Sequence, residues 1–359
     1  MRIGIDGRKI PQSAKRGPVG SLEHGKALGM AGLFFRTVLD MSPTLDRGLL
    51  AAVRTRADEL GLYLEAGLGK VNPYATPEAP ELRAIGDGDI VLGFRLMMEA
   101  GTAIDVRELW VSTANRKPKF YGRLSYDRFR TDAPWADQLA ATERFLKKLA
   151  PIARDLGIHM NLETHEEIST FEVVRLVEAV GPDTVGIVLD TSNMLHRAEH
   201  PVHAARRVAP YVRQTHFKDA YVAFRPGGIV LQNRPCGDGV VDFAAVVEIL
   251  AAANPRLNLT IENAEPHAER TIGRTQTIVE VFDPRFLEGH PDLSVEELAA
   301  YLALVRDYEQ GFGARGILDW AAYEARTFGY DESVAEIQRS ASHLRTLIPA
   351  APEASRSAA

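Results

Sequence analysis

Four short apolar segments between residues 158 and 262 each end in a side chain that can bind a metal ion. Apolar runs of this length are typical of buried strands. If these strands are parallel neighbours in one barrel, their carboxyl ends meet at one rim, and side chains far apart in the sequence can converge there. The four terminal residues are Glu163, Asp190, His216 and Glu262.

Three carboxylates and one imidazole form a mostly oxygen donor set, which suits Mn²⁺, Mg²⁺ or Co²⁺ better than a thiolate-bound metal. We therefore expect these four residues to bind one divalent ion, with Mn²⁺ as the first choice. A single Asp or Glu at a strand end is more often a helix cap or a surface charge. Four in succession are harder to explain in that way, and three carboxylates at one rim would repel one another without a cation between them.

The elements that would position these residues follow a repeated order of amphipathic helix, glycine and short apolar strand. One helical pattern ends at Gly61, and the apolar segment 62–65 follows. The same order recurs at 139–156, Gly157 and 158–163. Such an alternation predicts βα units around a parallel sheet.

Counting segments of this kind gives eight strands, which favours a closed (β/α)8 barrel, the TIM-barrel fold, over an open sheet. No Gly-x-Gly-x-x-Gly follows the first segment, and the glycine loop at 235–239 lacks the Lys-Ser/Thr of a phosphate loop, so we expect no nucleotide cofactor. The predicted strands lie near residues 2–6, 33–38, 62–67, 106–113, 158–163, 186–190, 213–217 and 258–262.

The pattern predicts one domain over residues 1–348, with a large insertion at 264–330 between the eighth strand and the last helix. The insertion contains a predicted helix at about 294–311, preceded by Ser294 as a capping residue. Long insertions after barrel strands lie at the face where active sites form, so this one is expected to be a lid or an interface. The Ala/Ser/Pro-rich tail 349–359 is expected to be disordered.

The composition is that of an ordinary globular protein: 359 residues, 45% hydrophobic and 25% charged. A net charge of −6 argues against a nucleic-acid partner, which normally requires a concentrated basic face. The single cysteine, Cys236, excludes an internal disulfide and fits a reducing compartment. No stretch approaches the roughly 18 apolar residues of a membrane span. We expect a cytoplasmic protein without a membrane partner.

Short strings around the predicted ligands form a further pattern: Leu162-Glu163-Thr164-His165, Leu189-Asp190-Thr191, His216-Phe217-Lys218-Asp219, Pro235 to Gly239 followed by Val241-Asp242, and Ile261-Glu262-Asn263. They resemble the xylose isomerase-like TIM-barrel superfamily. That group includes sugar isomerases, ketose 3-epimerases, inosose dehydratase, endonuclease IV and the metal-binding subunits of C-glycoside deglycosidases. The resemblance covers residues 1–263 and the last helix.

By this resemblance the four residues carry over as metal ligands, and Glu163 and Glu262 also exchange protons at the carbon beside a carbonyl. His165 and Lys218 lie two residues beyond a ligand, hence on the same face of an extended strand, and are further catalytic candidates. Each has a structural alternative, a loop histidine or a salt bridge. The candidates for substrate binding are Asn193, Arg234, Glu65 and Trp110.

The first functional expectation is a divalent-metal-dependent sugar isomerase or epimerase that acts through an ene-diolate. The alternative is a lyase on the same platform, which eliminates a β leaving group from a 3-keto sugar or glycoside. Epimerases of the group have a histidine three residues after the Asp, where this sequence has Asn193, and this departure keeps the lyase open. A non-catalytic scaffold and a metal-dependent phosphodiesterase are weaker hypotheses. The expected partners are a small sugar and either further copies of the chain or a second subunit.

Overall fold

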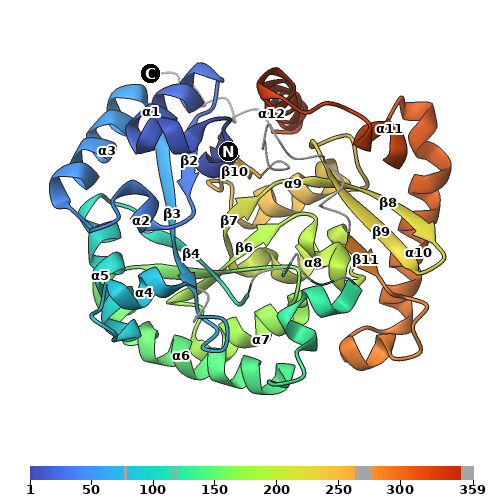
Figure 1. Cartoon of the computed structure of the whole chain (residues 1–359), viewed down its shortest axis with the longest axis horizontal. Coiled ribbons are helices and arrows are strands. Elements are labelled where there is room, and N and C mark those ends of the chain that lie inside the picture. The colour runs from blue at the N-terminus through green and yellow to red at the C-terminus, as the bar shows by residue number, and fades with distance from the viewer. Residues whose placement is uncertain (77–78, 115–116, 118–119, 121, 263–276, 349–359) are drawn as a thin grey trace, which may run out of the picture.

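Eight parallel strands form the barrel that the sequence predicts (Figure 1). This computed structural model describes residues 1–359 apart from 77–78, 115–116, 118–119, 121, 263–276 and 349–359. The strands pair in the order β10-β1-β2-β3-β4-β5-β6-β7. Their bounds are β1 Ile3–Asp6, β2 Gly32–Phe35, β3 Tyr63–Lys70, β4 Glu108–Ser112, β5 His159–Glu163, β6 Val185–Asp190, β7 Val212–His216 and β10 Leu259–Ile261.

The barrel closes between β10 and β7, the two ends of this strand order, through one β-bridge in the described part of the chain. Phe217, which follows β7, pairs in parallel with Ile261 of β10. The Phe217 amide donates to the Thr260 carbonyl at 2.7 Å, and the Glu262 amide donates to the Phe217 carbonyl at 2.9 Å. The (β/α)8 fold is therefore confirmed, and this junction lies directly beside two of the four predicted metal ligands.

Helices surround the strands on the outside of the barrel (Figure 1). Glycines end two of them as the sequence pattern predicts, since Gly61 and Gly157 adopt left-handed backbone conformations with φ of 66° and 63°. The helices are α1 Ser13–Ala27, α2 Val38–Met41, α3 Arg47–Leu60, α4 Pro80–Ala84, α5 Ile90–Ala103, α6 Trp135–Leu156, α7 Thr170–Val180, α8 Pro201–Val208, α9 Phe243–Ala253, α10 Val295–Gly311, α11 Trp320–Glu324 and α12 Tyr330–Arg345.

Several 3₁₀ turns lie at the ends of strands and in the long loops. The ones used below are η1 Gly7–Lys9, η3 Gly122–Ser125, η4 Asp127–Phe129, η5 Asn193–Arg197 and η8 Phe286–Gly289. None of the helices in the described part of the chain combines the length and the apolar character needed to cross a membrane.

The inside of the barrel is layered. Near the amino ends of the strands, Gly4 and Gly32 leave room for the ring of Tyr63, since a Cβ on Gly32 would lie 2.3 Å from that ring. An apolar layer above it contains Phe34, Trp110 and Val188. The polar site described below lies at the carboxyl ends, above this dry layer.

A small second sheet was not anticipated from the sequence. β8 (Asp219–Arg225) and β9 (Gly228–Arg234) form an antiparallel hairpin directly after β7, and β11 (Thr277–Val279) pairs with β9. The predicted helix near 294–311 is present as α10, with Ser294 accepting a hydrogen bond from the Glu297 amide. The ring of Tyr221 on β8 packs edge-on against Tyr308 of α10 at 5.6 Å.

The insertion 264–330 thus contributes β11, α10 and α11 beside the hairpin (Figure 1). Its first part, 264–276, lies outside the described residues, as does the tail 349–359. A lid or interface role for the insertion stays a prediction.

Candidate metal centre

The four predicted ligands meet at the carboxyl ends of the barrel strands. Glu163, Asp190 and His216 are the last residues of β5, β6 and β7, and Glu262 directly follows β10. All four are buried, and each offers one ligand atom within 4.8 Å of the others. The parallel register of one closed barrel therefore brings together residues that are far apart in sequence, as predicted.

Glu163 has an N–H donor at each carboxylate oxygen. Its Oε1 lies 2.9 Å from Nδ1 of His216, and its Oε2 accepts from the indole Nε1 of Trp110 at 2.8 Å. Burial opposes ionisation of Glu163, but the charge and hydrogen bond of His216 outweigh it and lower the pKa to about 2. Trp110, predicted as a pocket residue, thus orients a predicted ligand.

Glu262 lies among cations. Nη2 of Arg36 is 2.5 Å from its Oε1, and Nζ of Lys218 is 3.1 Å from its Oε2. Burial again opposes ionisation, but Lys218 and Arg36, followed by Lys9, outweigh it and hold the pKa of Glu262 well below its ordinary value. Glu262 is therefore an anion at neutral pH.

Asp190 is the least compensated acid of the four. Burial raises its pKa to about 6, against the opposing charge of Lys218, whose Nζ lies 2.9 Å from Oδ2. The Oδ1 atom accepts from the backbone amides of Ser192 and Asn193 at 2.9 Å each, while Oδ2 lies against the Lys218 ammonium. A further cation at this oxygen would stabilise the ionised form of Asp190.

These residues fit a divalent ion. The donor set is hard and mostly oxygen, and the ligand atoms converge from four strand ends. Burial raises the pKa of Asp190 even with the Lys218 ammonium 2.9 Å from its Oδ2, so a further cation would stabilise its charge. The cluster could hold one ion, and Mn²⁺ stays the first choice among Mn²⁺, Mg²⁺ and Co²⁺.

A second pair of groups lies beside the cluster. Nδ1 of His165 is 2.5 Å from Oε2 of Glu167, and Thr113 donates to the other oxygen of the same carboxylate. Glu167 is buried, whereas the His165 side chain is 15% exposed. Burial would lower the pKa of His165, but Glu167 outweighs it and raises the pKa to about 10.

Two residues predicted to bind substrate, Asn193 and Glu65, lie at different depths in the barrel. Asn193 is buried directly beyond Asp190, and its Oδ1 has no hydrogen-bond partner among the described residues. Glu65 lies inside the barrel and accepts from Asn258 at 3.2 Å and Thr260 at 2.9 Å.

Arg234 is not brought to the cluster. Its guanidinium donates to the side chain of Gln232 and to the carbonyls of Leu318 and Asp319, and it packs 3.8 Å from the ring centroid of Tyr323. Arg234 thus joins the hairpin to the segment before α11. It has no part in the function proposed below.

Three residues beside the site were missed from the sequence: Arg36, Asp6 and Glu167. Asp6 ends β1 and accepts from Arg36 at 3.0 Å. The signal that could have found Asp6 is the one used for the four ligands, a polar residue at a strand end. Arg36 directly follows β2 and shares its inward side with Phe34, so strand parity could have found it.

Comparison with known proteins agrees with this geometry. A family model described as xylose isomerase-like TIM barrel matches residues 22–280. The chain belongs to that family. The xylose isomerase-like resemblance predicted from the strings around the ligands is thereby confirmed.

The curated relatives of the chain include two kinds of enzyme, a decarboxylase and inosose dehydratases. The 3-oxo-isoapionate decarboxylase of Pectobacterium atrosepticum is 26% identical over 223 residues, which cover 60% of this chain and 78% of that protein. An inosose dehydratase of Bacillus anthracis is 24% identical over 127 residues, 30% of this chain and 41% of that protein. The match to another curated relative covers only 29% of the length of that protein.

Among solved structures, the 3-keto-D-glucoside 4-epimerase of E. coli is similar in fold. The two chains are 17% identical, with a TM-score of 0.55 over 86% of this chain and 99% of the other. This likeness shows that the xylose isomerase-like barrel is shared.

Proposed function

We propose that this chain is a divalent-metal-dependent lyase that removes a β leaving group from a keto sugar or keto glycoside. This was the alternative hypothesis from the sequence. The observation that carries this proposal is the His165–Glu167 pair beside the metal centre, in which Nδ1 of His165 lies 2.5 Å from Oε2 of Glu167.

Two-base epimerisation requires two carboxylates that can each take and return a proton at the reacting carbon. Here Oε2 of Glu163 already accepts from Trp110, and Oε1, which lies 2.9 Å from Nδ1 of His216, faces the position where the ion would bind. Both oxygens of Glu262 lie against Arg36 and Lys218. These contacts favour roles in holding charge over roles in carrying protons.

His165 has the arrangement of a single proton carrier. Glu167 fixes the orientation of the ring through Nδ1, and Thr113 fixes Glu167. The other ring nitrogen, Nε2, has no hydrogen-bond partner among the described residues and can carry a proton to or from a substrate. A histidine oriented by a buried carboxylate is a common form of general acid and base.

The proposed step balances as the loss of H–X from the substrate. In the metal-free chain the charges of Glu167 and Glu163 raise the pKa of His165, and a divalent ion bound at Glu163 would lower it and so favour the neutral ring. Nε2 of this neutral ring takes the proton from the carbon beside the carbonyl, and the electrons of that C–H bond form the new C=C bond. The bond to the β substituent X breaks, and X leaves with its electron pair. His165 then returns the proton to X. No oxidant or reductant is needed.

The cluster would support this step by charge. Glu163, Asp190, His216 and Glu262 would hold the divalent ion, which supplies Lewis-acid polarisation of the substrate's carbonyl when bound. Lys218 places an ammonium group beside Asp190 and Glu262, where its positive charge would stabilise the negative charge that develops on the substrate's carbonyl oxygen.

The relatives are consistent with this choice. A decarboxylase and a dehydratase, by their names, both remove a group from the substrate. Epimerisation stays the competing hypothesis, since two glutamates are present in the cluster.

The test uses the chain loaded with Mn²⁺ and a 3-keto glycoside of 4-nitrophenol in D₂O. Elimination predicts release of 4-nitrophenol and formation of the unsaturated keto sugar. His165→Gln should lower kcat by about 10²- to 10⁴-fold, the usual contribution of general acid–base catalysis. Its bound Mn²⁺, measured by elemental analysis, should equal that of the wild type.

The matched control is His159→Gln, which changes a histidine at the opposite end of the same strand. Its kcat should stay within about twofold of the wild type, because surface substitutions away from a site have small effects. Recovery of a deuterated epimer without release of nitrophenol would replace the lyase by an epimerase.

A further inference from the structure

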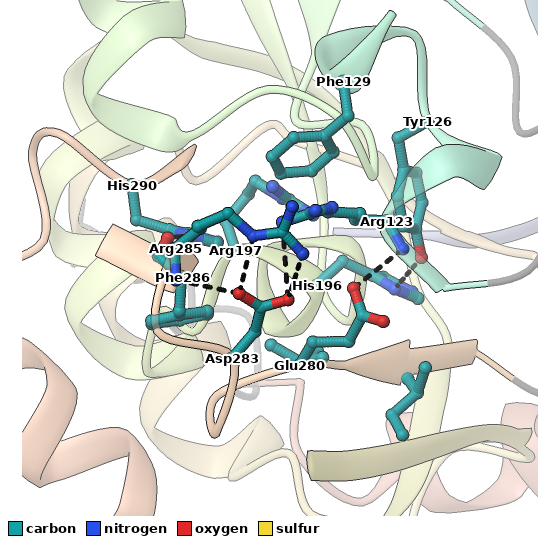
Figure 2. Close-up of a pocket in the computed structure, with 12 residues that line it drawn as sticks. Arg123, Tyr126, Phe129, His196, Arg197, Glu280, Asp283, Arg285, Phe286 and His290 are labelled. Carbon is teal, nitrogen blue, oxygen red and sulfur yellow. Dashed lines mark hydrogen bonds and ion pairs between the residues drawn. The ribbon is translucent and has the colours of Figure 1, made fainter. Parts of the chain in front are cut away.

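A pocket on the carboxyl side of the barrel is lined mainly by charged and aromatic side chains (Figure 2). It lies between the segment with η3 and η4, the turn η5, and the segment from β11 to η8. Tyr126 and Phe129 form part of its wall, and Arg123, Arg197 and Arg285 contribute guanidinium groups. No step of the proposed reaction uses this pocket.

Arg197 is the unusual member of this lining. The residue is only 4% exposed, and its guanidinium packs 5.2 Å from the ring centroid of Tyr126 and 5.5 Å from that of Phe129. Nε and Nη1 are buried without any hydrogen-bond acceptor among the described residues, and no carboxylate of that part of the chain forms an ion pair with Arg197.

The other charged side chains in and near the pocket have partners of their own, and Glu280 accepts a hydrogen bond from the backbone amide of Arg123 at 3.2 Å. Asp283 accepts three hydrogen bonds from Arg285 and lies 3.5 Å from the guanidinium of Arg123, as the dashed lines in Figure 2 show. Behind the pocket, Glu172 accepts two hydrogen bonds from Arg128. The carboxylate of Glu167 is paired with the ring of His165. Within the described part of the chain, Arg197 is therefore left without an ion-pair partner of its own.

A buried guanidinium without a counter-ion is costly, because desolvation is not repaid by an ion pair or by hydrogen bonds. Burial and the neighbouring charge of Arg128 lower the pKa of Arg197 to about 10, which still leaves it charged at neutral pH. An anion entering the pocket would supply the missing partner. Arginine is well suited to carboxylate and phosphate groups.

We propose that Arg197 anchors a subsite for an anionic group of the substrate, a carboxylate or a phosphate. This inference rests on the proposed function, because it takes the bound anion to be part of the substrate of the metal centre. It narrows that substrate to a sugar acid or a sugar phosphate.

The subsite and the metal centre are joined by short connections. Arg197 ends η5, which begins beyond Asp190 and is tied to that carboxylate by the Asn193 amide. In the same turn, Nδ1 of His196 lies 2.8 Å from the hydroxyl of Tyr126, and Nε2 lies 3.7 Å from Oε1 of Glu166. Both sites thus lie on the carboxyl side of β5 and β6.

The experiment measures binding without turnover. The full chain is titrated in a calorimeter with inorganic phosphate, D-gluconate and neutral D-glucose in separate runs. Binding of phosphate alone indicates a sugar phosphate, and binding of gluconate indicates a sugar acid. Arg197→Met, which keeps the apolar stem, should lower the affinity for the anion at least tenfold. Arg197→Lys should recover part of that affinity.

The matched control is Arg285→Met, which removes a guanidinium from the same pocket that is exposed and paired with Asp283. Its anion affinity should stay within threefold of the wild type. Absence of binding of both anions to the wild type, or equal binding to Arg197→Met, would overturn the subsite.

A structural role for Arg197 predicts a different result. It predicts that Arg197→Met lowers Tm in anion-free buffer, while the proposed subsite predicts an unchanged or higher Tm because an unpaired buried charge is removed. Glu163→Gln separates this inference from the proposed function. It should abolish turnover and leave anion binding intact.

Discussion

Nη2 of Arg36 lies 2.5 Å from Oε1 of Glu262, so the end of β2 is tied to the end of β10 across the intervening strand β1. The same nitrogen lies 3.0 Å from Oδ2 of Asp6 on β1. One cation thus compensates two carboxylates at the rim where the metal centre lies.

Arg36→Met should destabilise the metal-free protein by about 3–5 kcal/mol, because it removes the ion-pair partner of buried Asp6 and one of the cations around buried Glu262. Urea unfolding in the presence of a chelator measures this loss. Arg95→Met removes an exposed arginine that pairs with Glu99 on α5 and should cost less than about 1 kcal/mol. Equal losses in the two variants would contradict the role assigned to Arg36.

Mn²⁺ should stabilise the folded chain, since the cluster exists only when the strand ends have assembled. Free Mn²⁺ at about one hundred times its Kd raises the free energy of unfolding by about 2.7 kcal/mol. Asp190→Asn should lose most of this increment, because one of the anionic ligands is removed. Thermal unfolding of chelated and Mn²⁺-loaded protein measures it, and an undiminished increment in Asp190→Asn would exclude Asp190 as a ligand.

Trp110→Phe should weaken metal binding without removing a ligand. The indole Nε1 donates to Oε2 of Glu163, and loss of a partner that orients a ligand typically costs about 10- to 100-fold in metal affinity. Competition with a coloured chelator measures the affinity. Trp135→Phe removes an indole that donates to Glu172 instead, and it should leave the metal affinity unchanged.

Glu199 should make stability depend on pH. It is buried beside Arg207 and Thr170, and burial raises its pKa from 4.5 to about 7. Because the folded-state value is the higher one, the contribution of Glu199 to stability is complete below about pH 4.5 and is lost as the pH rises through 7.

Glu199→Gln removes this titration. The free energy of unfolding of the wild type should therefore fall relative to that of Glu199→Gln between pH 4.5 and 8, by about 3 kcal/mol in total. Glu143→Gln, on the surface of α6, is the control and should show a constant difference from the wild type. A constant difference for Glu199→Gln as well would refute the prediction.

The barrel and the cluster could be predicted because both follow from one repeated local rule. Each βα unit has its own amphipathic helix, glycine stop and apolar strand, so Gly61 and Gly157 mark boundaries without any knowledge of tertiary contacts. Once the strands are parallel neighbours, the carboxyl ends must share a rim, and Asp190 and His216 must come close.

What could not be predicted depends on contacts outside that rule. The β8–β9 hairpin has a turn signal in Pro226-Gly227, but it interrupts the βα repeat on which the strand count rested. The position of the Arg234 side chain depends on hydrogen bonds to the carbonyls of Leu318 and Asp319, which come from a distant part of the chain. Its sequence neighbours alone gave no sign of them.

The barrel is closed between β7 and β10 by one bridge pair, with His216 on one side and Glu262 on the other. An ion bound by both side chains would cross-link the two strands where backbone pairing is sparsest. Loading the metal should therefore slow hydrogen exchange at the amides of Phe217 and Glu262 more than at the amides of β5 and β6. In this fold the catalytic ion would also complete the circle of strands.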